Sequence, residues 1–237
     1  ALAIVSRGGS TPAAMLLAFM TATPILTLIV SNTATTLIMM PIAVAVLHAA
    51  RIEEGHTEGF AGALAMGIAF AASIGGLGTL VGSPTNAIAA GIIERATGLR
   101  IDFLTWAIYG LPLVLIAIPL CWLILLKVQR VRPNDFDPAA ATAGIGEAGA
   151  WSTAEKRLVP LIAAVVAGWV MLPFLTPLLP PDALTDGTIA VLGALLLFVI
   201  PDGTGRALLN WDEANRAPWG VIMLFGGGLA LAAGIGA

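Results

Sequence analysis

The sequence predicts an all-α, polytopic membrane protein, and two observations support that fold class. Of its 237 residues, 58% are hydrophobic and only 11% are charged, and the mean hydropathy is +0.96, which is more apolar than soluble domains are. Apolar stretches of about 18 residues or more, the length that crosses a bilayer, recur at residues 12–30, 34–50, 59–93, 103–127, 158–175, 184–201 and 217–237.

Charge and cysteine content disfavour several other classes of protein. The net charge is −3 and the basic residues form no block, so nucleic acid is not an expected partner. The single cysteine, Cys121, lies in an apolar run, which leaves neither a disulfide framework nor a thiolate metal cluster. Because no ionisable residue lies deep in the apolar stretches, neither a proton-relay pump nor an intramembrane protease is favoured, and we do not expect an enzyme.

The first two apolar stretches are predicted to form a re-entrant helical hairpin. Between them lie Ser31, Asn32 and Thr33, a polar cluster among otherwise apolar residues. Backbone at membrane depth must be hydrogen-bonded internally or line a cavity, so the cluster indicates a hairpin tip that faces water or a ligand. These residue types are preferred N-caps, so the second arm begins here. The free N–H groups at its start would attract anions.

The third apolar stretch, residues 59–93, is too long for one straight crossing and is predicted to be a discontinuous helix. The glycines that let its backbone unwind and approach a ligand closely are Gly75, Gly76, Gly78 and Gly82. Ser83 and Pro84 then form an N-cap and first-turn pair for the next half-helix. In secondary transporters, unwound carbonyls coordinate small cations and half-helix N-termini hold anions.

Each of these residues also has a simpler explanation. A lone Ser or Thr in a membrane helix usually bonds its own backbone, and a glycine usually permits close helix packing. It is the occurrence of two such clusters in one chain that indicates a site for a cation and an anion.

Two polar runs resemble the paired signature motifs of the divalent anion/sodium symporter family, in residue types and in spacing. They are Ser31, Asn32, Thr33, Ala34 and Thr35, and Gly82, Ser83, Pro84, Thr85 and Asn86. Residues 218–232 are similar to the helix that precedes the second hairpin in that family, so the resemblance covers nearly the whole chain. It implies inverted repeats, each with a re-entrant hairpin and a broken helix, which assemble as a homodimer and work by an elevator movement. The second pair of motifs is then expected beyond Ala237.

The resemblance also implies which residues bind. It assigns sodium to Ser31, Asn32, Gly82 and Thr27, and the substrate carboxylate to Asn32, Thr33, Ser83 and Pro84. We add Thr85 to the carboxylate site because its hydroxyl lies at the start of the second half-helix. Thr85 stands where the family often has proline.

The expected function is sodium-coupled secondary transport of C4 dicarboxylates (succinate, malate, fumarate) across the inner (plasma) membrane, with the bilayer and a second copy as partners. Burying a dianion without compensation costs roughly tens of kcal/mol. No Arg or Lys stands near either motif, so backbone dipoles and bound sodium ions must compensate its charge. Citrate carries an additional carboxylate that needs a further partner, so we expect C4 acids to bind better.

Other functions stay open at this point. A carrier of sulfate or another oxyanion, or a sodium-independent dicarboxylate exchanger, would use the same helix-end geometry. A channel or a membrane scaffold subunit belongs to a different class and predicts neither a saturable site nor sodium dependence.

The predicted organisation has three parts: a first-repeat segment over residues 1–130, a cytoplasmic linker over 131–156, and the start of a second repeat over 157–237. Counting basic residues orients the chain. Arg95 and Arg100 fall on the outside, and nine of the eleven basic residues fall on the cytoplasmic side if the hairpin is re-entrant. Those nine are Arg7, Arg51, Lys127, Arg130, Arg132, Lys156, Arg157, Arg206 and Arg216.

Overall fold

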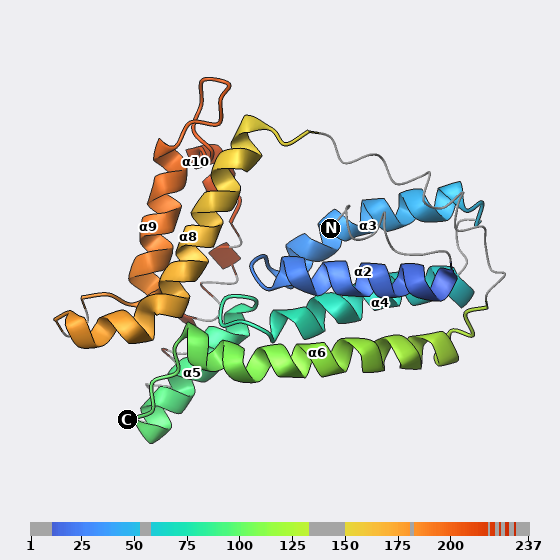
Figure 1. Ribbon diagram of the computed structural model, residues 1–237, viewed down its shortest axis with the longest axis horizontal. Coiled ribbons are helices and arrows are strands. Elements are labelled where there is room, and N and C mark those ends of the chain that lie inside the picture. The colour runs from blue at the N-terminus through green and yellow to red at the C-terminus, as the bar shows by residue number, and fades with distance from the viewer. Residues whose placement is uncertain are drawn as a thin grey trace. The chain divides into compact units, whose positions relative to one another are not determined.

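The structure is a computed structural model that describes residues 11–52, 58–132, 150–180 and 183–217, together with residues 219, 220, 223, 226, 227 and 230. Helices account for its regular structure apart from one isolated β-bridge in the described ranges, between Pro201 and Ala207. The helices are α2 (Pro12–Thr27), α3 (Asn32–Ala49), α4 (Gly59–Gly76), α5 (Pro84–Thr97), α6 (Phe103–Val128), α8 (Thr153–Leu175), the 3-10 helix η1 (Thr176–Leu178), α9 (Asp186–Val199) and α10 (Trp211–Ala214) (Figure 1).

The prediction of an all-α, polytopic membrane protein is confirmed. Among the described residues, four helical segments are long and apolar enough to cross a membrane, namely α3, α4, α6 and the run Thr153–Leu178 that joins α8 to η1. The apolar helices α2 and α9 are shorter, with 16 and 14 residues. The re-entrant course of the α2–α3 hairpin stays a prediction.

The apolar stretches of the sequence map onto these helices with two differences. Residues 184–201 yield only the 14-residue α9, because the chain turns at Ile200 and enters the bridge at Pro201. Residues 217–237 lie mostly outside the described part of the chain, as does the core of the predicted linker. The division into three segments therefore stays a prediction.

The chain divides into two compact units, residues 1–149 and 150–237. In the first, α2 packs along α4, and both pack against α3 and α6 (Figure 1). The core of this unit centres on α2, where Leu16, Phe19 and Met20 are fully buried. On α4, Gly67 allows the close approach, since a Cβ there would lie 2.9 Å from Leu16 Cδ1.

Local sequence signals set the helix ends of the first unit. Thr11 caps α2 by accepting from the N–H of Ala14 at 3.2 Å. Asp102 caps α6 by accepting from the N–H of Thr105 at 2.8 Å. Gly98 ends α5 with φ +73°, a left-handed conformation that suits glycine.

In the second unit, α8 and α9 lie side by side (Figure 1). Ser152 and Glu155 form a capping box at the start of α8. Gly193 of α9 meets α8 closely, because a Cβ there would lie 2.6 Å from Val165 Cγ2. The indole N–H of Trp169 donates to the carbonyl of Asp186 at 3.0 Å, which ties the two helices together.

Candidate functional site

The first polar motif lies in the turn of the α2–α3 hairpin. Helix α2 ends at Thr27, and α3 begins at Asn32. Ser31 is the N-cap of α3, as the sequence predicts, and its hydroxyl accepts from the N–H of Ala34 at 3.4 Å. Ser31 and Thr33 are exposed. Within the described ranges, the side chain of Thr33 makes no hydrogen bond.

Within this motif, the side-chain amide oxygen of Asn32 gives the strongest indication of a ligand. Its amide oxygen Oδ1 is buried and has no hydrogen-bond partner among the described residues. The amide lies directly against the α-carbon of Gly76, where no Cβ would fit. A buried acceptor without a partner is uncommon in folded proteins and calls for an explanation.

Thr27 lies one turn before the tip and is fully buried. Its hydroxyl donates to the carbonyl of Thr23 at 2.9 Å, so the hydroxyl oxygen keeps acceptor capacity. The backbone carbonyl of Thr27 points toward the second motif, since a Cβ on Gly82 would lie 3.0 Å from it.

The second polar motif is a break between α4 and α5, as the glycines of this stretch predict. Residues 77–83 are not helical, and they separate Gly76 from Pro84. Gly82 is buried, and a Cβ there would lie 2.7 Å from the carbonyl of Gly76. Only glycine permits these two backbone segments and the end of α2 to approach so closely.

Two side chains within the break bond its backbone. Asn86 donates through Nδ2 to the carbonyls of Gly76 at 2.6 Å and of Thr79 at 2.8 Å. Thr79 donates its hydroxyl to the carbonyl of Leu28 at 2.5 Å, and its Oγ1 accepts from the N–H of Gly82 at 3.0 Å. The break is therefore an ordered structure that is bonded to the hairpin turn.

Helix α6 covers one side of the break. The indole N–H of Trp106 donates to the carbonyl of Leu77 at 2.9 Å. Gly110 lies against the same backbone, and a Cβ there would lie 2.5 Å from the carbonyl oxygen of Leu77. Beside this contact is a pocket of about 310 Å³ lined by Leu77, Ile101, Thr105, Trp106, Tyr109, Gly110 and Leu113. Because its lining is almost entirely apolar and includes no residue of either polar motif, the pocket does not suit a dianion.

The start of α5 follows directly on Gly82. Ser83 is its N-cap and Pro84 its first residue, but the Ser83 side chain makes no capping hydrogen bond. Instead, the hydroxyls of Ser83 and Thr85 pair at 2.8 Å. Pro84 and Thr85 are exposed. The helix end thus presents two hydroxyls to its surroundings.

The structure brings together three of the four residues expected to bind sodium. Thr27, Asn32 and Gly82 converge where the hairpin turn meets the helix break, with Gly76 between them. The fourth, Ser31, adjoins Asn32 but uses its hydroxyl as the α3 cap. Of the residues expected to bind the carboxylate, Ser83, Pro84 and Thr85 share one helix start, and Asn32 and Thr33 share the other.

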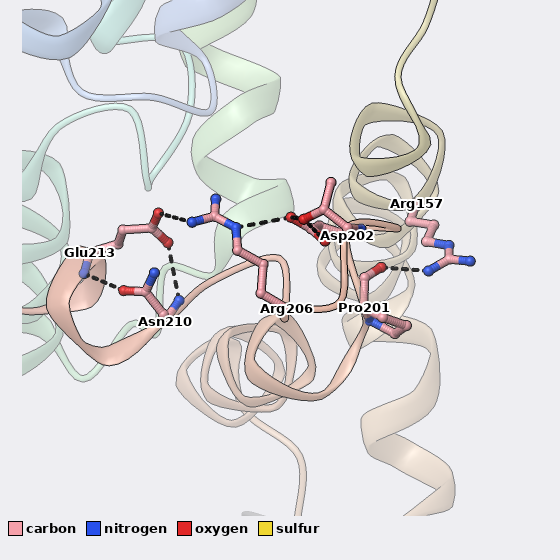
Figure 2. A network of polar contacts seen from close by, with 7 residues as sticks. Arg157, Pro201, Asp202, Arg206, Asn210 and Glu213 are labelled. Carbon is pink, nitrogen blue, oxygen red and sulfur yellow. Dashed lines mark hydrogen bonds and ion pairs between the residues drawn. The ribbon is translucent and has the colours of Figure 1, made fainter.

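A second polar cluster lies in the loop after α9, within the second unit. Figure 2 shows Arg206 between Asp202 and Glu213, with Nε 2.9 Å from the Asp202 carboxylate and Nη1 3.2 Å from that of Glu213. Asn210 and Glu213 form a capping box for α10. Arg157 of α8 donates to the carbonyl of Pro201 at 2.6 Å. These contacts hold the loop in one conformation.

The carboxylate of Asp202 is fully used by this loop. Hydrogen bonds from the backbone and hydroxyl of Thr204 and from Arg206 lower the pKa of Asp202 to about 2. The same carboxylate and Glu213 raise the pKa of Arg206. Because the carboxylates of Asp202 and Glu213 are both paired with Arg206, the cluster stabilises the loop and is not a candidate ligand site.

Four residues that shape the site were not predicted from the sequence to be part of it. They are Thr79, Asn86, Trp106 and Gly110. Asn86 closes the second motif and so was within reach of a motif-based prediction. The contact of Trp106 with Leu77 joins residues 29 positions apart and leaves no local signal in the sequence.

Comparison with known proteins shows which family the sequence matches. Residues 1–237 match the model of the CitMHS family, described as citrate transporter. The chain is 36% identical over 248 residues to the sodium-dependent dicarboxylate transporter SdcS of Staphylococcus aureus strain USA300, covering 99% of this chain and 48% of that protein. The protein of the same name from the bovine strain RF122 / ET3-1 is similar to the same extent. The chain thus spans about half the length of the curated relatives it matches.

Proposed function

The chain belongs to the CitMHS citrate transporter family, and from that membership we propose that it forms one binding half of a sodium-coupled carrier of C4 dicarboxylates in the inner (plasma) membrane. The family match extends over the whole chain and bears out the resemblance to the divalent anion/sodium symporters. The family and the relatives are described as transporters, so the chain is one of a family of carriers and not of enzymes.

The observation that carries this proposal is the convergence of Thr27, Asn32 and Gly82. The buried Asn32 Oδ1 has no hydrogen-bond partner in the described chain, and the Thr27 carbonyl faces the break at Gly82. Neutral oxygen ligands of this kind suit a hard cation. Sodium, as a co-substrate, would take the Asn32 amide oxygen together with oxygens of Thr27, Ser31 and Gly82. The matched relatives are named sodium-dependent.

The dicarboxylate would bind beside this site, at the two helix starts. Ser83 and Thr85 offer hydroxyls at the N-terminus of α5, and Asn32 and Thr33 lie at the N-terminus of α3. Helix N-termini favour anions through their free N–H groups and dipole. Pro84 has no N–H and would act by shape.

Charge compensation explains why the two solutes should bind together. Along α5, the first basic side chain after Pro84 is Arg95, 11 residues on and roughly 16 Å away along the helix axis. A dianion at the helix start therefore has no cationic side chain of α5 beside it. Bound sodium would supply positive charge there, and the helix ends would supply part of the remainder.

Citrate is a second candidate substrate, because the family description names it. Its third carboxylate would need a further partner beside Ser83 and Thr85, and neither motif contains a basic residue. We therefore place C4 acids ahead of citrate. In the proposed carrier, the hairpin and the broken helix move together as an elevator within a homodimer.

The function is tested with the full-length protein in proteoliposomes, by uptake of radiolabelled succinate under an inward sodium gradient or an equal potassium gradient. We expect saturable uptake that requires sodium and that unlabelled succinate inhibits more strongly than citrate or sulfate does. Uptake driven by internal dicarboxylate without sodium would identify an exchanger instead. Uptake that does not saturate would identify a channel, and stronger inhibition by citrate or sulfate would reassign the substrate.

A further inference from the structure

One hydroxyl connects the hairpin turn to the helix break. Thr79 is 6% exposed, and its Oγ1 donates to the carbonyl of Leu28, 51 residues earlier in the chain, at 2.5 Å. The same oxygen accepts from the N–H of Gly82 at 3.0 Å. Leu28 directly follows Thr27, and both Thr27 and Gly82 are assigned to sodium. The Thr79 hydroxyl therefore connects the two segments that contribute to the proposed sodium site.

Asn86 completes the connection from the other side of the break. It is 3% exposed, and its Nδ2 uses both hydrogens, one for the carbonyl of Gly76 and one for that of Thr79. The carbonyl of Gly76 ends α4, where the helical ladder stops and leaves it without a helical partner. The carbonyl of Thr79 lies within the break and also accepts from the N–H of Gly82 at 3.3 Å. Asn86 thereby fixes Thr79, which in turn fixes Leu28 and Gly82.

We propose that Thr79 and Asn86 are positioning residues that set the geometry of the sodium site by holding the hairpin turn and the helix break as one unit. This inference rests on the proposed function, because the oxygens so positioned are those assigned to sodium. Neither side chain need touch sodium or the dicarboxylate, and each acts through the backbone it binds.

This role predicts a specific kinetic effect. Without the Thr79 hydroxyl, the carbonyl of Thr27 and the backbone of Gly82 lose their fixed separation, so sodium binds more weakly. Each hydrogen bond that is lost weakens binding by about 2-fold to 12-fold. The maximal rate at saturating sodium changes little, because the groups assigned to the dicarboxylate are retained.

The test compares sodium activation of succinate uptake in the full-length parent and in Thr79→Val, Thr79→Ser and Thr21→Val. Thr79→Val should raise the half-activating sodium concentration about threefold or more, while Thr79→Ser keeps the hydroxyl and stays close to the parent. Thr21→Val is the matched control, because the Thr21 hydroxyl donates only to Ala18 of its own helix. Unchanged sodium activation in Thr79→Val would overturn the proposal.

Hydrogen exchange provides a readout that does not depend on transport. In Thr79→Val, amides of residues 28–32 and 78–83 of the full-length protein should exchange faster than in the parent, and those segments should stay protected in Thr79→Ser. Equal exchange rates of these amides in the parent and in Thr79→Val would show that Thr79 does not hold the two segments together. If the parent takes up succinate without sodium, the proposed function fails, and exchange alone then decides whether Thr79 links the two segments. Thr79→Ala replaces Thr79→Val in both assays if the valine variant does not reach the membrane.

Discussion

At the scale of single residues, the buried amide oxygen of Asn32 is the atom that links fold to function. An acceptor buried without a partner costs about 1–3 kcal/mol, and Asn32 Oδ1 makes no hydrogen bond to any described residue. Gly76 leaves room for this amide because it has no Cβ. The two residues therefore place an uncompensated oxygen beside the helix break, which suits a cation.

Thr85 allows a test of the anion site at the same scale. Thr85→Pro removes the backbone N–H and the side-chain hydroxyl of residue 85. In the parent, that hydroxyl lies 2.8 Å from the hydroxyl of Ser83. If either group binds the carboxylate, each loss costs about 0.5–1.5 kcal/mol, so the apparent succinate affinity should fall several-fold. Competition of unlabelled succinate against labelled succinate measures the change.

Thr85→Val is the matched control for this substitution, because it keeps the N–H and removes only the hydroxyl. A smaller effect in Thr85→Val than in Thr85→Pro would assign part of the binding to the backbone. An unchanged affinity in Thr85→Pro would remove Thr85 from the site.

At the scale of elements, the packing of α6 on the helix break is the contact most sensitive to added volume. Gly110→Ala places a Cβ about 2.5 Å from the carbonyl oxygen of Leu77 and 2.8 Å from that of Gly78. Because both obstacles are backbone, we expect a loss of about 1–3 kcal/mol in the free energy of unfolding. The midpoint of thermal unfolding of the full-length protein in detergent should fall accordingly.

Gly91→Ala provides the control, since nothing lies within 4 Å of a Cβ at that position of α5. The change should raise stability by up to about 1 kcal/mol, as Ala replaces Gly in a helix. Equal midpoints for the two variants would contradict the described packing of α6.

The loop between α9 and α10 should respond to acid in a defined range. The folded pKa of Asp202 is lowered from 3.8 to about 2, so its carboxylate stabilises the loop fully above pH 3.8 and loses that effect as the pH falls toward 2. Hydrogen-exchange protection factors of Thr204 and Leu208 should be constant from pH 7 to about 5 and should fall below about 4. In Asp202→Asn they should already be low at pH 7. Protection in that variant equal to the parent's would contradict the assignment.

The sequence predicted the helix break and the hairpin turn because their signals are local. Glycines allow an unwound backbone, and Ser31 and Ser83 mark helix starts that the structure confirms. The occurrence of both motifs in one chain indicated a shared site, and the family resemblance assigned ligand roles to their residues. The bonds of Thr79 to Leu28 and of Trp106 to Leu77 depend on how separate helices pack, so no local pattern could predict them.

At the scale of the whole molecule, the apolar surface indicates what surrounds the helices. On α6, Leu115 and Ile116 are 73% and 69% exposed within the described chain. Large apolar side chains at such exposure need contact with lipid or with further protein. Both kinds of contact are expected for a membrane transporter. This chain spans about half the length of the relatives it matches.

Orientation in the membrane can be tested by labelling single cysteines in intact cells. With Cys121 and any other native cysteine replaced, Trp151→Cys and Asn215→Cys should resist a membrane-impermeant reagent, because the excess of basic residues predicts that residues 128–156 and 203–217 face the cytoplasm. Leu99→Cys, 67% exposed beside Arg100, should react from outside. Labelling of Asn215→Cys from outside would reverse the predicted orientation.

The central claim is that Asn32 binds the sodium that drives uptake, and sodium activation of succinate uptake by Asn32→Ala in the full-length protein tests it most directly. Asn215→Ala makes the same side-chain change at an exposed position and serves as the control. We expect Asn32→Ala to reach the membrane normally but to lose sodium-driven uptake, while Asn215→Ala behaves as the parent does. Sodium-driven uptake by Asn32→Ala with an unaltered half-activating sodium concentration would show that Asn32 does not bind the coupling sodium.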